Sequence, residues 1–134
     1  MKIINDALLK KVAGEAKLSP RLRMNYNFHQ SLQDKCHRFL NALEPGTQIP
    51  VHHHPTKDET FVILKGKVRV STYNDDSEVL ESFVISHESG VYGADIPKGV
   101  WHSVECLEPS VLLECKEGPF VEHEVDGILE IKKA

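Results

Sequence analysis

The chain of 134 residues has few cysteines and no long hydrophobic segment. No apolar run approaches the roughly 20 residues that a membrane-spanning helix needs, so we expect no membrane partner. Its cysteines, Cys36, Cys106 and Cys115, are odd in number and lack C-x-x-C spacing. The N-terminal segment carries scattered charges where a signal peptide has its apolar core. These features together predict reduced thiols and a cytoplasmic location.

An excess of basic residues is also absent. The 16 Lys and Arg residues against 20 Asp and Glu residues leave a formal net charge of −4. This balance argues against nucleic acid or an anionic membrane surface as the main partner. We found no repeat, linker or low-complexity block, and the length suits one domain with a sizeable buried core. The sequence therefore predicts a single domain over residues 1–134.

Helical signals are nearly confined to the N-terminus. Asn5 or Asp6 can cap a helix over residues 5–17, and Ser19-Pro20 ends it. Beyond Pro20 the pattern changes to short β-type runs that are separated by turn residues. The runs cover residues 39–43, 49–54, 59–64, 67–73, 79–85, 93–96, 101–106 and 111–116. Many short strands with little helix predict an all-β fold, either an antiparallel sandwich or a closed barrel.

One further strand is predicted over residues 21–29, where polar and apolar residues alternate strictly. One face is apolar, and the other presents Arg21, Arg23, Asn25, Asn27 and His29. A solvated outer face is the commoner fate of such residues on an antiparallel strand. Asparagine is depleted in strands, however, and a row of Arg, Asn and His donors suits a pocket for a carboxylate, phosphate or sugar. We favour the pocket and assign these residues to substrate binding, with His29 as a candidate acid or base.

The segment from Gly46 to Gly66 carries the strongest chemical signal. His52 and His54 are two residues apart, so on a strand they share a face while His53 points away. A turn over residues 55–58 would return Glu59 beside them on the next strand. With the later His102, the set offers three imidazoles and one carboxylate, which suit a divalent Fe, Mn, Co, Ni or Zn ion.

The competing interpretation of this segment is an exposed histidine tract. The positions of two glycines argue against this interpretation, because Gly46 lies six residues before His52 and Gly66 lies seven residues after Glu59. No cysteine lies within the proposed ligand set, which disfavours a closed structural zinc site. Four protein ligands leave one or two positions open on a five- or six-coordinate ion, where a substrate or O₂ can bind. We therefore predict one divalent metal ion per chain, held by His52, His54, Glu59 and His102.

The spacing of these residues resembles that in a known protein family. The spacing Gly46-x5-His52-x-His54-x4-Glu59-x6-Gly66 resembles the first motif of the cupin superfamily at every position. Pro97, Gly99 and His102 resemble the second cupin motif, which supplies the last metal ligand. This second motif departs from the pattern in two places. Gly90 lies seven residues before Pro97 instead of six, and Cys106 stands where many cupins have asparagine.

A closer resemblance covers most of the chain. The segments RLRMNYNFH, NALEPGT, HPTKDETFV, IPKGVWH and ECKEGP are similar to cupin-fold metalloproteins of the WbuC type, which occur in bacterial polysaccharide gene clusters. The resemblance implies a cupin-type antiparallel β-barrel (double-stranded β-helix or jelly roll) with one short N-terminal helix. It divides the chain into a helical segment 1–19, a barrel 20–120 and a C-terminal tail 121–134. It also implies that Arg38 and Asp34 belong to the pocket.

The functional expectation is a metal-binding cupin that binds or transforms a small anionic or sugar-like molecule, in connection with surface polysaccharide. The alternatives are a non-catalytic binding or sensory domain, a metal-dependent dioxygenase, and a β domain that acquires metal adventitiously. Isomerisation or epimerisation needs a base near the metal, for which His29 is the candidate. A homodimer formed through a sheet edge is compatible with the pattern, although no residue indicates it.

The remaining residues of interest receive structural assignments. Trp101 precedes His102 and is expected on the opposite face, in packing rather than in substrate contact. Cys106 shares the parity of His102 and is expected as a buried, inert thiol. The other histidines lack partner spacing and are expected at the surface: His37, His87 and His123.

Overall fold

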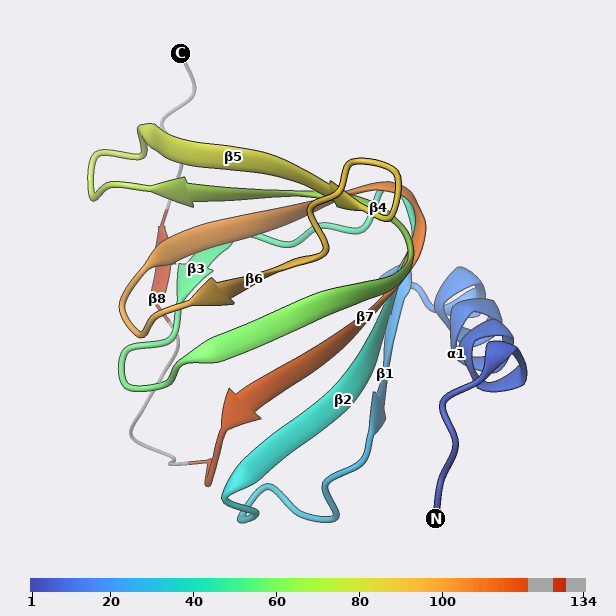
Figure 1. Ribbon diagram of the computed structural model, residues 1–134. Coiled ribbons are helices and arrows are strands. Elements are labelled where there is room, and N and C mark those ends of the chain that lie inside the picture. Colours follow the sequence, from blue (N-terminus) through green and yellow to red (C-terminus); the bar gives the residue numbers. More distant parts are fainter. Residues whose placement is uncertain (121–126, 130–134) are drawn as a thin grey trace.

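The computed structural model describes residues 1–120 and 127–129 (Figure 1). Within them the chain forms a helix followed by strands that pair antiparallel throughout. The elements are α1 (Asp6–Leu18), β1 (Arg23–Asn27), β2 (Cys36–Leu43), β3 (Val51–His53), β4 (Glu59–Tyr73), β5 (Val79–Ser86), β6 (Gly93–Ile96), β7 (Trp101–Glu117) and β8 (Gly127–Leu129). The prediction of an all-β fold with one short N-terminal helix is confirmed.

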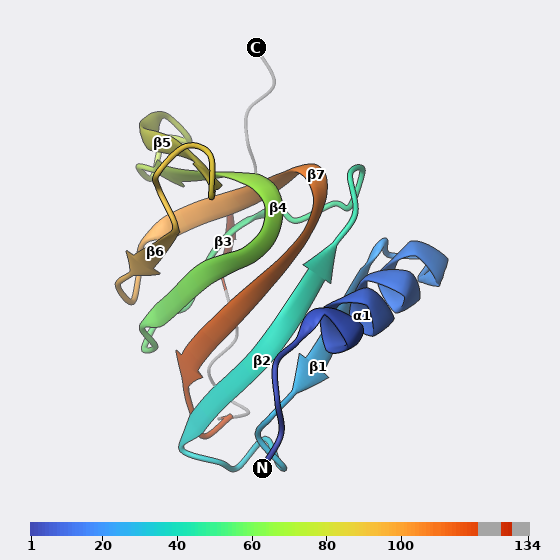
Figure 2. The same cartoon turned by 45° about the vertical axis from the view of Figure 1, so that its right-hand side comes forward.

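Helix α1 begins and ends where the sequence indicates. The side chain of Asn5 caps it by accepting a hydrogen bond from the backbone N–H of Leu8 at 3.0 Å. Ser19 ends it in an extended conformation, directly before Pro20. Val12 and Ala16 are buried against the sheet, while the opposite face of the helix is exposed. Figure 2 shows α1 lying across the outer side of β1 and β2.

The long strands β4 and β7 belong to both layers of a β-sandwich. The first half of β4 pairs with β6 and with the second half of β7, which continues into β2 and β1. The second half of β4 pairs with β5 and with the first half of β7, which continues into β3 and β8. Both long strands bend between these halves (Figure 1), and register shifts interrupt their pairing between Ile63 and Val68.

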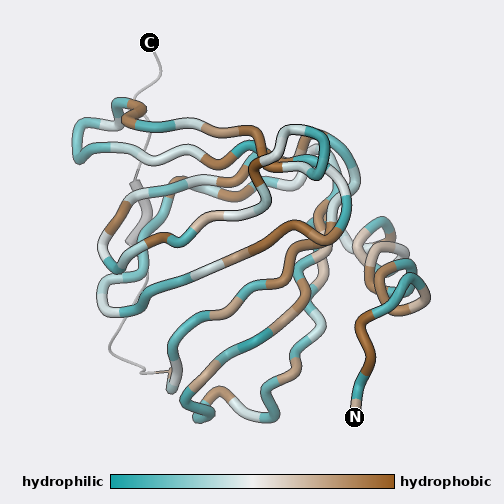
Figure 3. The backbone as a smooth tube through the Cα atoms, in the orientation of Figure 1, coloured by the Kyte–Doolittle hydropathy of each residue, from teal (hydrophilic) through white to brown (hydrophobic). Residues whose placement is uncertain are grey.

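Two apolar cores hold the sandwich and the helix. One lies between the layers and is built from Leu43, Phe61, Ile63, Val68, Val70, Ile85, Ile96, Cys106 and Leu112. The other lies between α1 and the sheet and contains Val12, Ala16, Leu40, Ala42 and Val111. Strand β2 serves both cores because successive side chains point to opposite faces. Figure 3 shows the resulting alternation of hydrophobic and hydrophilic residues along several strands.

The structure differs from the sequence prediction at several boundaries. Lys65-Gly66 and Glu108-Pro109 were predicted to separate strands, but β4 and β7 run through them as bent, bulged strands. The sandwich also does not close into a continuous barrel, since β5 and β6 each pair only with β4 among the described residues. Part of the predicted tail, residues 127–129, pairs with β3, and the rest of residues 121–134 lies outside the described residues. No described helix is long and apolar enough to span a membrane.

Candidate metal centre and ligand cavity

Three histidines from two strands and a loop converge between the layers. His52 in β3 lies directly opposite His102 in β7, and their ring centroids are 4.3 Å apart. His54 follows two residues later on the same side, with its ring 5.1 Å from that of His52. Each of the three residues offers a ligand atom, and these atoms lie within 4.8 Å of one another. His54 and His102 are buried, with 7% and 1% of their surface exposed.

Backbone carbonyl groups orient two of these imidazoles. Nδ1 of His52 lies 2.9 Å from the carbonyl oxygen of Pro50, and Nδ1 of His102 lies 2.9 Å from that of Val100. A carbonyl oxygen only accepts hydrogen bonds, so each Nδ1 carries a proton and Nε2 is left as the nitrogen that can bind a metal ion. Burial lowers the pKa of His102, which keeps the ring neutral. Neutral, oriented imidazoles are the form in which histidine binds metal.

Glu59 lies beside the histidines at the start of β4. Its Oε2 atom is 2.8 Å from Nε2 of His54, and 8% of its surface is exposed. Burial acts to raise the pKa of Glu59, but the hydrogen bond and the charge of His54 outweigh it, so the pKa is lowered. A metal ion that takes Nε2 of His54 would displace its proton and would meet the Glu59 carboxylate at the same point. The prediction of Glu59 as a fourth ligand is compatible with this placement and stays a prediction.

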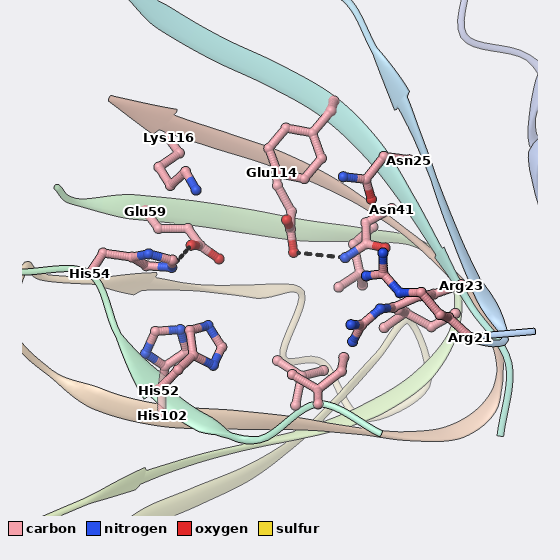
Figure 4. A pocket seen from close by; sticks show the side chains of 15 residues that line it. Arg21, Arg23, Asn25, Asn41, His52, His54, Glu59, His102, Glu114 and Lys116 are labelled. Carbon is pink, nitrogen blue, oxygen red and sulfur yellow. Dashed lines mark hydrogen bonds and ion pairs between the residues drawn. The ribbon is translucent and has the colours of Figure 1, made fainter. Parts of the chain in front are cut away.

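The histidines form one end of a cavity of about 310 Å³, which we call the histidine cavity. Its polar lining consists of Arg21, Arg23, Asn25, Asn41, His52, His54, Glu59, His102, Glu114 and Lys116. Figure 4 shows the guanidinium groups of Arg21 and Arg23 pointing into the cavity from the side opposite His52 and His102. The apolar face of β1 packs toward α1 through Met24, Tyr26 and Phe28. The polar face of the strand, with Arg23 and Asn25, is thereby directed between the layers, and Arg21, which precedes the strand, lines the same cavity.

Three polar residues that line the cavity were not predicted from the sequence: Asn41, Glu114 and Lys116. Nδ2 of Asn41 in β2 donates a hydrogen bond to Oε1 of Glu114 in β7 at 3.5 Å. Burial and the neighbouring Glu59 carboxylate raise the pKa of Glu114 to about 8. A signal was available, because Leu112, Glu114 and Lys116 alternate along one face of a buried strand. An acidic residue at such a position needs either a partner or a function.

Three residues that were assigned to the substrate pocket lie elsewhere. Asn27, His29 and Arg38 line a separate pocket near Lys2, on the side of the sheet that faces α1. Arg38 precedes the cavity residue Phe39, so the two side chains point to opposite faces of β2. His29 is held by a hydrogen bond from the backbone N–H of Arg38 to its Nδ1 at 3.2 Å. The hypothesis that His29 approaches the metal is therefore corrected by the structure, since the strand ends before it.

A further correction concerns His37, which was expected at the surface. It is 6% exposed and stacks on His29, with ring centroids 4.3 Å apart and an interplanar angle of 6°. Its Nε2 donates to the carbonyl oxygen of Leu32 at 3.1 Å. Asp34, which the family resemblance placed in the pocket, instead accepts a hydrogen bond from the backbone N–H of Gln30. His37 and Asp34 thus serve to build the β1–β2 connection.

The other structural assignments agree with the structure where it describes them. His53 points away from the cavity and packs edge-to-face on Trp101, with ring centroids 4.0 Å apart. Trp101 donates its indole N–H to Asp75 at 2.9 Å. Cys106 is buried in the core between the layers, and burial raises the pKa of its thiol to about 11. His87 is exposed, as expected. His123 lies outside the described residues.

The residues present fit a divalent metal ion at the histidine end. Nε2 of His102 is buried and has no hydrogen-bond partner among the described residues. Two nitrogens bound to one ion at about 2.1 Å lie at most about 4.2 Å apart, so the 4.8 Å limit of the cluster requires only small side-chain rotations. The chain therefore has a cupin-like fold, an antiparallel β-sandwich with a candidate metal centre between its layers.

The chain belongs to the family described as "Domain of unknown function (DUF6016)", whose model matches residues 4–85. The match covers His52, His54 and Glu59 and ends before His102. No curated protein matches the chain significantly.

Solved structures with the same fold include three informative examples. The protein TT1209 from Thermus thermophilus is 25% identical with a TM-score of 0.63, covering 87% of this chain and 97% of its own. CapF, a capsular polysaccharide assembling protein from Staphylococcus aureus, is 23% identical with a TM-score of 0.63, covering 80% and 29%. Oxalate decarboxylase from Lactobacillus farciminis is 21% identical with a TM-score of 0.56, covering 72% and 27%. The chain thus spans less than a third of the length of the latter two.

Proposed function

We propose that this protein is a metal-binding cupin whose histidine cavity binds a small anionic or sugar-like molecule. His52, His54, His102 and Glu59 would hold one divalent transition metal ion, namely Fe, Mn, Ni, Co or Zn. The observation that carries the proposal is the convergence of three histidine ligand atoms within 4.8 Å of one another. Two of these imidazoles are oriented by backbone carbonyls, which is the preparation that a metal site requires.

The side chains at the opposite end of the cavity suit an anionic or polar ligand. Arg21 and Arg23 face the histidines, and among the described residues neither forms an ion pair with a carboxylate. When bound, the metal would supply Lewis-acid polarisation and a fixed point for the ligand. The two guanidinium groups would orient the ligand from the other side, by charge-assisted hydrogen bonds.

An enzyme is favoured over a pure binding domain by the position of Glu114. Burial and the Glu59 charge raise the pKa of this carboxyl group to about 8 in the metal-free protein. A buried carboxyl group that faces the cavity is a side chain of the kind that acts as a general acid or base. Asn41 holds this carboxyl group within the cavity. Glu114 therefore replaces His29 as the candidate acid–base residue. A ligand-binding or sensory domain is the second candidate, because the same arginines would bind a ligand without turnover.

The proposal is tested by elemental analysis of untagged protein and of two neighbouring histidine variants. His54→Ala should lower the metal content from about one ion per chain to a trace, with affinity reduced at least about 100-fold. His53→Ala is the matched control, because this side chain packs on Trp101 outside the cavity. Full metal content in His54→Ala, or equal losses in both variants, would contradict the assignment of the ligands.

Turnover separates an enzyme from a binding domain. Protein loaded with Fe, Mn, Ni or Zn should be assayed for oxygen uptake and for conversion of sugars, sugar acids and nucleotide sugars. Conversion that is lost in Glu114→Gln at unchanged metal content supports the enzyme. Stable retention of an unchanged molecule in both proteins supports the binding domain.

We also propose a setting in bacterial surface polysaccharide metabolism. The support is the similarity of five segments, from Arg21–His29 to Glu114–Pro119, to cupins of the WbuC type. Three of these segments contain cavity residues outside the metal motif, among them Arg21, Asn41 and Glu114. Deletion of the gene in its own host, followed by analysis of the surface polysaccharide, tests this setting directly.

A further inference from the structure

The histidine cavity contains buried polar atoms that no described protein group satisfies. They are Nε of Arg23, Oδ1 of Asn41 and Nε2 of His102. All three residues line the same cavity. A buried polar atom without a partner is destabilising, so a molecule that supplies the missing partners binds with a corresponding advantage. The chemical nature of each atom specifies which partner is missing.

Arg23 and Arg21 require an acceptor that carries negative charge. Nη1 of Arg23 donates to the carbonyl oxygen of Gln48 at 3.0 Å, while its Nε, which only donates, has no partner among the described residues. Burial and the like charge of Arg21 both lower the pKa of Arg23, so the two guanidinium groups lie close enough to repel each other. An anion bound by both relieves this repulsion. A carboxylate matches the planar guanidinium donors in geometry.

Asn41 requires a donor. Its amide nitrogen donates to Glu114, so the atom without a described partner is the carbonyl oxygen, which only accepts. An ammonium group is a poor donor here because Arg21, Arg23 and Lys116 line the same cavity and would repel it. A neutral hydroxyl group supplies the hydrogen bond without that repulsion.

The cavity also limits the size of the ligand. Its volume of about 310 Å³ is near the lower end of the range for small-molecule sites, about 300–1,000 Å³. We propose that the ligand is a small hydroxy acid, sugar acids included. Its carboxylate contacts Arg21 and Arg23, its hydroxyl group donates to Asn41, and further oxygens face the histidines. This inference deepens the proposed function, on whose ligand site it rests.

Calorimetric titration of the zinc-loaded full chain tests the inference with matched probes. Malate and succinate differ by one hydroxyl group, and glucuronate and glucose differ at the carboxylate. Malate should bind at least about tenfold more tightly than succinate, and glucuronate at least about tenfold more tightly than glucose. Equal affinities within either pair would overturn the inference.

An Asn41 variant separates recognition by the protein from chelation by the metal. Asn41→Leu keeps a similar volume but removes the acceptor, so malate should bind no better than succinate. The comparison is made within the pair, because loss of the Asn41–Glu114 hydrogen bond affects both ligands alike. Asn27→Leu is the matched control, because Asn27 lines the separate pocket near Lys2. Its preference for malate should be that of the unmodified protein. A preference that persists in Asn41→Leu, with folding verified by thermal melting, would overturn the inference.

Failure of this inference is distinguishable from failure of the metal site. Zinc content is measured in the same samples, and the titrations are repeated on chelator-treated protein. Protein that holds zinc but does not discriminate malate from succinate contradicts the hydroxy-acid ligand alone. Protein that holds no zinc but discriminates them through Asn41 supports the ligand and contradicts the metal.

Discussion

The carboxyl groups of Glu59 and Glu114 line one cavity, yet their pKa values are shifted in opposite directions. Both residues are 8% exposed, so burial penalises the charge of each. His54 lies 2.8 Å from Glu59 and lowers its pKa, whereas Glu114 faces the neighbouring Glu59 charge and has a raised pKa of about 8. Because the two pKa values are shifted in opposite directions, Glu59 keeps its charge while Glu114 holds its proton. The pair therefore contributes two opposite pH dependences to the stability of the metal-free protein.

The first prediction concerns the stability of metal-free protein. Folding lowers the pKa of Glu59 below its unfolded value of about 4.5. The charged carboxylate therefore stabilises the folded protein above pH 4.5, and this stability is lost as the pH falls below that value. Folding raises the pKa of Glu114 from about 4.5 to about 8. The stability from its protonated form is fully present below pH 4.5 and is lost as the pH rises toward 8. Stability should therefore be greatest near pH 5, measured by denaturant unfolding of chelator-treated protein.

Glu114→Gln isolates the second half of this dependence. The variant should gain on the order of 2 kcal/mol at pH 8 relative to the unmodified protein and show little change at pH 5. Glu88→Gln, an exposed residue in the turn after β5, serves as the control and should show no difference. A Glu114→Gln variant that is equally destabilised at both pH values would contradict a protonated Glu114.

The second prediction follows from the position of His29. Because His29 lies in the pocket near Lys2 and not in the histidine cavity, His29→Ala should leave the metal content unchanged. Loss of its stacking on His37 should lower the free energy of unfolding by about 1 kcal/mol. Elemental analysis and denaturant unfolding measure the two effects separately. If this variant lost as much metal as His54→Ala, the result would contradict this prediction and show that His29 contributes to the metal site.

The third prediction compares two glycines. Gly66 has a φ of +93°, and an added Cβ would overlap the carbonyl oxygen of Pro109, so Gly66→Ala should destabilise by at least about 2 kcal/mol. Gly14 lies in α1 with no heavy atom within 4 Å of an added Cβ. Gly14→Ala should therefore stabilise by about 0.5–1 kcal/mol, through higher helix propensity. Equal changes in thermal melting of both variants would contradict the bend in β4.

The fourth prediction concerns the thiols. Cys36 and Cys115 are exposed, whereas Cys106 is buried with its thiol directed at the carbonyl oxygen of Leu43, 3.4 Å away. A disulfide reagent should therefore modify two thiols in the native protein and the third only after unfolding. Cys115 should react more slowly than Cys36, because burial raises its pKa. The variants Cys36→Ser and Cys115→Ser should each lose one of the two thiols that react in the native protein.

Much of the fold and of the histidine cluster was predictable because it depends on local patterns. The cap at Asn5 and the stop at Ser19-Pro20 are properties of a few consecutive residues. The alternation of side chains along a strand predicts that His52 and His54 share one face and that His53 lies on the other. In the structure His53 packs on Trp101, away from the cavity. The partnership of His52 with His102 depended on a resemblance between motifs, since nothing local connects residues so far apart in the chain.

The sequence by itself thus determined the helix, the strand faces and the residues that meet at the histidine end. Tertiary structure decided which polar residues share the cavity with them. The pairing of β2 with β7 brings Asn41 next to Glu114, and the end of β1 at Asn27 sends His29 to the other side of the sheet. Strand pairing and strand ends result from long-range packing, which a periodic pattern does not encode. For this reason the hydrogen bond between Asn41 and Glu114, the candidate determinants of ligand choice, emerged only from the folded chain.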